Sequence, residues 1–138
     1  MSNNRNWETR WDDFEIRKTI ESSKSTIGLL EKSVENSYER NRMSWDKIEN
    51  WSYQLEMLKN EFKELNGITF EEATEYVNNS WNPDNDFNLE QYNSIKKIED
   101  KISGEKFFIY QREKMIYKNK AIIEEIYQRI NELKAQSK

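Results

Sequence analysis

The residue types that most often carry out chemistry in proteins are scarce in this sequence. Its 138 residues include no Cys and no His. The chain can therefore form neither a disulfide nor a Ser–His or Cys–His pair, and a zinc or di-iron site would have to rely on carboxylates alone. Asp84, Asp86 and Asn88 alternate as in a calcium-binding loop, but Leu89 and Ile95 occupy the positions where such a loop has Gly and Glu. We expect no metal, no cofactor and no catalytic residue.

Charge argues against nucleic acid as a partner. The 22 basic and 26 acidic residues give a net charge of −4. Lys114, Lys118 and Lys120 form a basic patch, but Glu residues are interspersed with them, so the electrostatic footprint of a nucleic-acid binder is missing. With 35% charged and 35% hydrophobic residues, the composition is typical of long helices and coiled coils. This composition favours a helical interaction protein over an enzyme.

No segment has the features of a membrane or export signal. The first twenty residues lack the apolar run of a cleaved signal peptide, and no stretch is long and apolar enough to span a bilayer. We expect a soluble cytoplasmic protein. The alternative is export together with a partner.

Two long seven-residue repeats define the elements that position any site. The first repeat predicts a helix over residues 20–66, ended by Gly67, which tolerates a left-handed cap. The second repeat predicts a helix over residues 89–135. The a positions of the first helix are Ile20, Ile27, Val34, Asn41, Ile48, Leu55 and Phe62. Those of the second are Ile95, Ile102, Ile109, Ile116, Ile123 and Ile130.

The segment between them, residues 67–88, is acidic and forms the predicted tip. Thr69 and Glu72 have capping-box spacing, so we expect a short helix from about Phe70 to Asn79. The predicted fold is a single all-α domain, residues 1–138: an elongated antiparallel two-helix coiled-coil hairpin with a short helix at the tip. Matching Leu65 with Leu89 gives a register in which paired residue numbers add to about 154.

Both repeats become polar at the same height of this register. We interpret Asn41 and Arg112 as a buried polar layer in which the Asn carbonyl accepts from the guanidinium and fixes the register. Alternatively, Arg112 extends to water and Asn41 is solvated. A third alternative is a break or hinge near residues 40–44. The polar seam positions are Ser37, Asn41 and Ser44 in the first helix and Glu105, Arg112 and Asn119 in the second.

The second helix carries more apolar residues than a two-helix hairpin can cover, which indicates a further helical neighbour. Trp7, Trp11 and Phe14 form a stripe outside the seam, in an aromatic N-terminal segment, residues 1–19. This segment either continues the first helix and exposes the stripe, or folds back after a break in SSKST, residues 22–26. The predicted partner-binding residues are Trp7, Trp11, Phe14, Trp81, Phe108, Met115, Ile116, Ile122 and Ile123.

The turn Trp81-Asn82-Pro83 and the C-terminal helix FFIYQREKMIYKNKAIIEEIYQRINEL carry a family resemblance. Over residues 27–134 the chain resembles the WXG100-like small proteins of type VII secretion, and more closely the accessory hairpins that accompany LXG toxins. The turn has Trp-x-Pro where the family has Trp-x-Gly, and the fourth residue after Tyr127 is Asn131 rather than Asp or Glu. The resemblance implies a targeting chaperone that lies against the N-terminal helical domain of a toxin and is carried by its partner's export signal.

Two other classes of interaction protein fit the same helices. One is a phage or mobile-element assembly protein that forms a homo-oligomeric helical bundle. The other is a small inhibitor that binds a host or defence protein through Trp7, Trp11 and Phe14.

Overall fold

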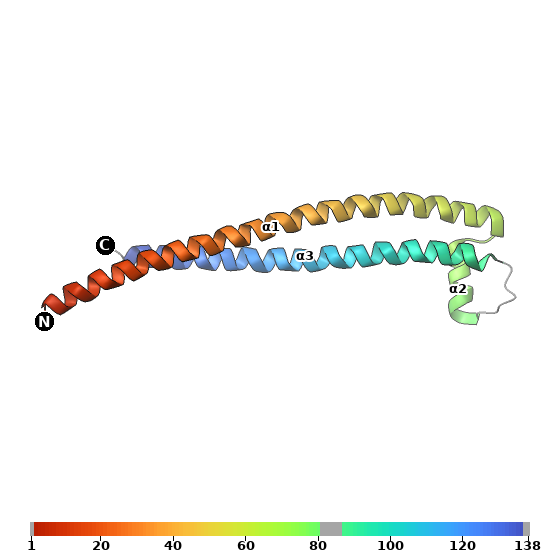
Figure 1. The fold of residues 1–138 in the computed structure, drawn as a ribbon. Helices are drawn as coiled ribbons and strands as arrows, with labels where there is room; N and C mark the ends of the chain where they lie inside the picture. The colour runs from red at the N-terminus through yellow and green to blue at the C-terminus, as the bar shows by residue number, and fades with distance from the viewer. Residues whose placement is uncertain (1, 81–86, 137–138) are drawn as a thin grey trace. The chain divides into compact units, whose positions relative to one another are not determined.

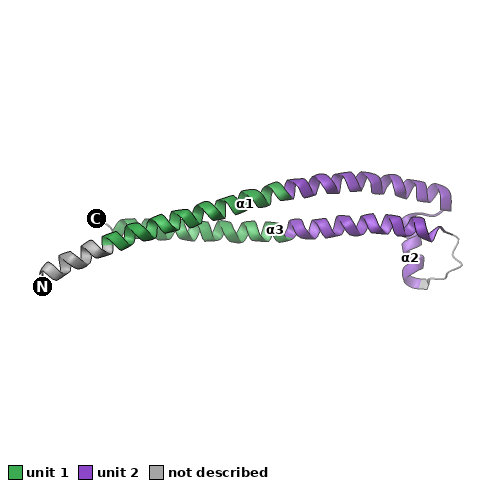
Figure 2. Ribbon diagram, in the orientation of Figure 1, with its two compact units in different colours: residues 1–40, 111–138 green, residues 41–110 purple. Residues whose placement is uncertain are grey.

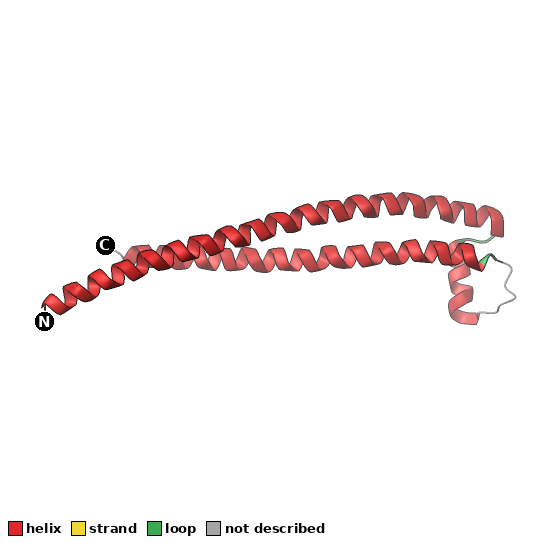
Figure 3. Cartoon of the chain, in the orientation of Figure 1, coloured by secondary structure: helices red, strands yellow, loops and turns green. Residues whose placement is uncertain are grey.

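The computed structural model describes residues 2–80 and 87–136, with the backbone alone for residues 2–12 and Ser80. The described residues form three helices and no strand: α1 (Ser2–Asn66), α2 (Phe70–Ser80) and α3 (Leu89–Gln136) (Figures 1 and 3). The long helices α1 and α3 pack against each other, so the all-α helical hairpin expected from the two repeats is confirmed.

The chain divides into two compact units, coloured separately in Figure 2. Unit 1 comprises residues 1–40 and 111–138, and unit 2 comprises residues 41–110. Each unit therefore contains one part of α1 and one part of α3, and unit 2 also contains α2.

Unit 2 has an aromatic core to which all three helices contribute. Phe62 of α1 and Ile95 of α3 are fully buried, and Phe70 of α2 stacks on Tyr92 of α3 with 4.9 Å between ring centroids. Phe87, just before α3, meets Phe62 edge to face at 6.1 Å. Such ring pairs add about 0.5–1.5 kcal/mol each to the free energy of burial. The short helix α2 thus closes the side of the α1/α3 pair that two helices alone would leave open.

The polar side chain of Asn66 connects the helix ends of unit 2. Its Nδ2 donates to the Phe62 carbonyl at 2.8 Å and to Gln91 Oε1 at 2.9 Å. Its Oδ1 accepts from the Asn88 backbone N–H at 2.9 Å. Gly67 follows with a φ of 72°, and its N–H donates to the Lys63 carbonyl, which is the left-handed cap expected from the Asn-Gly pair. Pairing of Asn66 with Asn88 agrees with the predicted register.

Helices α2 and α3 each begin at a side-chain cap. The Glu72 N–H donates to Thr69 Oγ1 at 3.1 Å, as the capping-box spacing predicts, and α2 begins at Phe70. The Gln91 N–H donates to Asn88 Oδ1 at 3.1 Å, so Asn88 caps α3. Both predicted helix starts are confirmed to within one residue.

Unit 1 holds together by a seam of aliphatic residues between two helices. Its buried apolar residues are Ile27 and Val34 of α1 and Ile116 and Ile130 of α3. In α1 the helix continues through residues 22–26, so the alternative in which this stretch breaks the helix is wrong. The Thr26 hydroxyl donates to the Ser22 carbonyl one turn earlier, which satisfies it within the helix.

Leu65 was expected at the seam, and this is wrong. Its side chain is 77% exposed. The α1 helix ends one residue later, and the core at this level is instead filled by Phe70 and Ala73 of α2. In unit 2, at the start of α3, the register derived from Leu65 still agrees with the structure, because its neighbour Asn66 makes the contact there.

Candidate partner-binding surface

The polar part of the seam contains a buried hydrogen bond in unit 2. Ser44 is buried, and its Oγ donates to Glu105 Oε1 at 2.6 Å. Both residues occupy d positions of the repeats, so the spacing that identified the polar seam positions could have identified this pair. A buried hydroxyl with a carboxylate acceptor satisfies its hydrogen bond without water.

Asn41 and Arg112 are less exposed than typical surface residues. Asn41 is buried in unit 2, and Arg112 is half-buried in unit 1. The burial of Asn41 contradicts the alternative in which it is solvated. The pairing of its carbonyl with the Arg112 guanidinium stays a prediction. The α1 helix is continuous through residues 40–44, so the alternative of a break in this stretch is wrong.

The predicted partner-binding residues of α3 differ in exposure. Ile116 is only 5% exposed and belongs to the seam of unit 1, so its assignment to an external surface is wrong. The a position places it in phase with Ile109 and Ile130, which are buried too. Met115, by contrast, is 55% exposed, and Ile122, seven residues further, is half-buried. In unit 1 these last two form an apolar strip beside the seam, hereafter the Met115–Ile122 strip.

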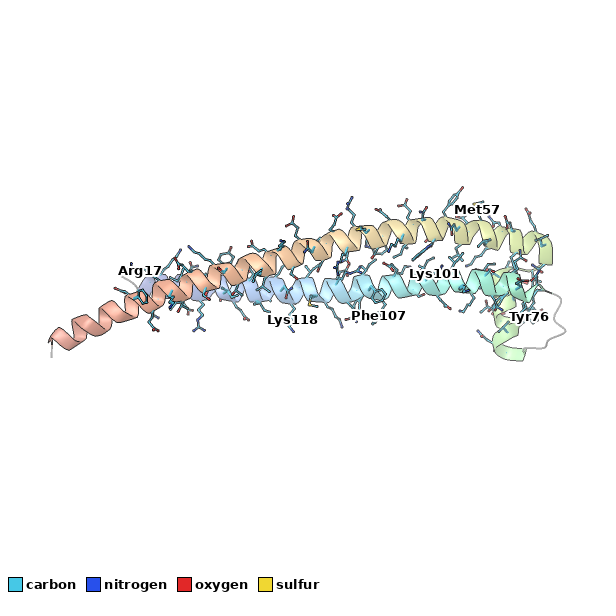
Figure 4. All side chains as sticks on the ribbon, viewed as in Figure 1. Arg17, Met57, Tyr76, Lys101, Phe107 and Lys118 are labelled. Carbon is cyan, nitrogen blue, oxygen red and sulfur yellow. The ribbon has the colours of Figure 1, made fainter. Side chains whose placement is uncertain are left out.

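Exposed aromatic rings also occur on α3 in unit 2. Phe107 and Phe108 are each more than half exposed, and their rings meet edge to face at 6.2 Å. Figure 4 shows Phe107 on the side of α3 that faces away from α1. These exposures are consistent with Phe108 as a partner-binding residue.

The N-terminal aromatic stripe is described only in part. The α1 helix includes Trp7 and Trp11, but their side chains lie outside the described residues, as does Trp81. Phe14 is 57% exposed, and Lys18 Nζ lies 5.9 Å from its ring centroid. Phe14 is therefore on the outside of unit 1, as the helical continuation of residues 1–19 requires.

A groove of about 520 Å³ lies on one side of unit 1, and sequence reasoning missed it. The apolar part of its lining comes from Val34, Ile123 and Tyr127. The Tyr127 hydroxyl donates to Glu31 Oε1 at 3.3 Å, and Glu31 also lines the groove. The remaining lining residues are Lys120, Glu124, Gln128 and Asn131. Ile123, a predicted partner-binding residue, is thus half-buried in the wall of an open groove.

A charge cluster in unit 2 perturbs two pKa values. Lys59 Nζ donates to Glu71 Oε1 at 2.9 Å and lies 3.5 Å from Glu99 Oε2. Burial acts to lower the pKa of Lys59, but the hydrogen bond and charge of Glu71, with Glu99, outweigh it and raise this pKa above its ordinary value. The Lys59 hydrogen bond lowers the pKa of Glu71. Because Lys59 also lies 5.2 Å from the Phe70 ring centroid, the cluster fastens α2 to α1.

Among the described side chains, those of residues 13–79 and 87–136, no three acidic groups gather closely enough to hold a metal ion. The helices of this part of the chain contain no apolar window long enough to cross a membrane. Comparisons with protein-family models, with curated proteins and with solved structures find no match.

Proposed function

We propose that this chain is a non-catalytic helical interaction protein whose unit 1 binds another helical protein. One observation carries the proposal. Among the described side chains of unit 1, four apolar residues are buried, whereas six large hydrophobic ones are about half exposed or more. Because two helices cover each other on one side only, a further helix is needed to cover the rest. The exposed residues are Phe14, Leu29, Tyr38, Met115, Tyr117 and Tyr127.

The Met115–Ile122 strip is the proposed binding surface. Its two residues are two turns apart on α3 and beside the seam, which is the spacing at which an amphipathic helix places successive anchors. Across the seam, the register places Ser33 of α1 near Ile122 and Arg40 near Met115. The small side chain of Ser33 leaves room beside Ile122 for an anchor of an incoming helix.

The partner class that we propose is the N-terminal helical domain of an LXG toxin, with this chain as its accessory or targeting chaperone. The support is the resemblance of residues 27–134 to accessory hairpins of type VII secretion, together with the apolar strip on the same C-terminal helix. Co-export with such a partner is part of the same proposal.

Co-purification followed by native mass spectrometry tests the proposal. The chain is co-expressed with the N-terminal helical domain of an LXG toxin, and the mass of the purified assembly is measured. We expect a complex of both chains that Met115→Asp and Ile122→Asp each weaken by about tenfold or more, because each places a charge in an apolar contact.

Lys118→Glu is the matched control, because Lys118 also lies on α3 but on the side that faces away from α1 (Figure 4). It should leave binding unchanged. Circular dichroism should show full helicity for all three variants, since Met115 and Lys118 are exposed and Ile122 is only half-buried. Separate elution of the two proteins, or equal binding by the Asp variants, would contradict the proposal.

A further inference from the structure

The side of unit 1 that holds the groove is separate from the Met115–Ile122 strip. Two contacts define its register: Tyr127 bonds to Glu31, and Lys120 Nζ lies 5.1 Å from the Tyr38 ring centroid. In both pairs the residue numbers add to 158, so each α1 residue on this side is level with one α3 residue. We name this surface the tyrosine flank. It comprises Lys24, Gly28, Glu31, Glu35 and Tyr38 of α1 with Lys120, Glu124, Tyr127, Asn131 and Lys134 of α3.

Charges of opposite sign lie at the two ends of the tyrosine flank. Lys24 is seven residues before Glu31, and Glu35 is four residues after it, so all three lie on one side of α1. On α3 the same rule places Lys134 and Glu124 on the side of Tyr127. All four charged side chains are exposed. The two lysines are level with each other, and the two glutamates are level to within one residue, about 16 Å further along at 1.5 Å per residue.

The charges of the tyrosine flank are complementary to those of the same surface on a second, antiparallel copy. On α1 the midpoint between Lys24 and Glu35 falls between residues 29 and 30, and on α3 the midpoint between Glu124 and Lys134 falls at Arg129. In the register of the flank these midpoints are level to within one residue. A single two-fold axis across both helices would therefore bring Lys24 and Lys134 of one copy opposite Glu35 and Glu124 of the other, as an isologous interface requires.

A glycine lies at the centre of this symmetry. Gly28 is inside a long helix, where Gly is about 1 kcal/mol less favourable than Ala. A Cβ added at Gly28 would meet nothing within 4 Å, so packing inside the chain does not require the glycine. The two-fold axis near residue 29 places Gly28 opposite Glu31 of the other copy. The missing side chain lets the two α1 backbones approach, and the adjacent groove of about 520 Å³ has room for side chains of the second copy.

We propose that two copies of this chain associate antiparallel through their tyrosine flanks, with Lys24 and Lys134 of each facing Glu35 and Glu124 of the other. About 22 residues of α1 overlap within unit 1, a length of about 33 Å. Across two helices of about 10 Å each, the interface covers about 1,300 Å² in total, within the range of specific protein interfaces. The association does not depend on the Met115–Ile122 strip.

Charge exchange tests the dimer in the full chain. Sedimentation equilibrium at low ionic strength measures the mass of Lys24→Glu/Lys134→Glu, of Glu35→Lys/Glu124→Lys, and of an equimolar mixture. We expect the unmodified chain to dimerise, and each double variant alone to dimerise at least about tenfold more weakly, because four attractive pairs become repulsive. The mixture should restore a dimer that contains one chain of each kind, which also shows that both variants fold.

Lys118→Glu is again the control, and it should dimerise like the unmodified chain. Met115→Asp/Ile122→Asp should dimerise unchanged as well, which separates this interface from the proposed hetero-partner surface. A monomeric mass for the unmodified chain at all concentrations would overturn the inference. So would charge variants that dimerise with unchanged affinity, or a mixture that fails to restore the dimer.

Discussion

Unit 1 and unit 2 use the same two helices but cover them to different degrees. In unit 2, α2 adds Phe70 and Ala73 to a core in which Phe62 and Ile95 are fully buried. In unit 1 no third helix is present among the described residues, and the buried apolar residues form a single seam. Exposure alone does not separate the two units, because ten large hydrophobic side chains are exposed in unit 2 and six in unit 1. The units differ in the third helix, so the two-helix unit 1 is where we expect an added helix to bind.

Removal of the central ring of unit 2 should have the largest effect on stability. Phe62→Ala should lower the free energy of unfolding by about 3–5 kcal/mol, because the cavity lies among three helices that cannot collapse into it. Urea unfolding followed by circular dichroism measures the loss. A loss comparable with that from an exposed residue, for which Tyr53→Ala is the control, would contradict the closed core.

An isoleucine pair compares the two units directly. Ile95 is fully buried among side chains of three helices, and Ile116 is buried in the two-helix seam. Ile95→Ala should cost about 3–5 kcal/mol and Ile116→Ala about 2–3 kcal/mol, since a site with an open side can relax or admit water. The same urea experiment gives both values. Equal losses would show that the seam of unit 1 is as closed as the core of unit 2.

The seven-residue repeats predicted the seam residues of both units. The a positions Ile27, Val34, Ile48 and Phe62 are buried, as are Ile95 and four further a-position isoleucines of α3, because a seven-residue repeat determines which side of a long helix faces its neighbour. The closure of unit 2 could not be predicted in this way. It depends on Phe70 and Phe87, which lie outside both repeats and reach the core only through the path of the tip.

The candidate surface was predicted less well than the fold. Ile116 occupies an a position and is buried, whereas Met115 lies beside it and is exposed. The seven-residue repeat distinguishes the two, but the wide apolar stripe of α3 includes both and does not. Ser and Thr permit both helix and turn, so the sequence does not decide the path of the N-terminal segment. In the structure the Thr26 hydroxyl bonds within the helix. The groove forms where Glu31 lies level with Tyr127. A sequence pattern defines which residues of two helices lie level only to within a few residues, so it could not predict the groove.

The buried hydrogen bond of unit 2 gives a smaller expected effect. Ser44→Ala removes the donor to Glu105 and leaves a half-buried carboxylate without it, at a cost of about 1–3 kcal/mol. Ser52→Ala, on the exposed side of the same helix, should cost less than about 0.5 kcal/mol. If the two alanine variants unfold at the same urea concentration, the hydrogen bond between Ser44 and Glu105 does not stabilise the fold.

The smallest effect is the pH dependence of the contact between α1 and α2. The lowered pKa of Glu71 means that its contribution is present at neutral pH and is lost as pH falls through that pKa. The raised pKa of Lys59 means that its contribution is lost only as pH rises through that pKa. Because the Glu71 side chain is 67% exposed, Glu71→Gln should cost no more than about 0.5 kcal/mol at pH 7.

The pH effect is measured as the difference in urea stability between the unmodified chain and Glu71→Gln from pH 7 downward. This difference should shrink to zero once Glu71 is protonated. A constant difference over the whole range would show that the ion pair with Lys59 does not stabilise unit 2.

Hydrogen exchange tests the central claim, that unit 1 is the binding part of the chain, most directly. Backbone exchange is measured by mass spectrometry for the isolated monomer and for the purified assembly, whether dimer or complex. Residues 13–40 and 111–136 should exchange faster in the monomer than the core of unit 2 and should gain protection on assembly, while residues 41–80 and 87–105 should change little. Protection gained in unit 2 alone, or in neither unit, would contradict the claim.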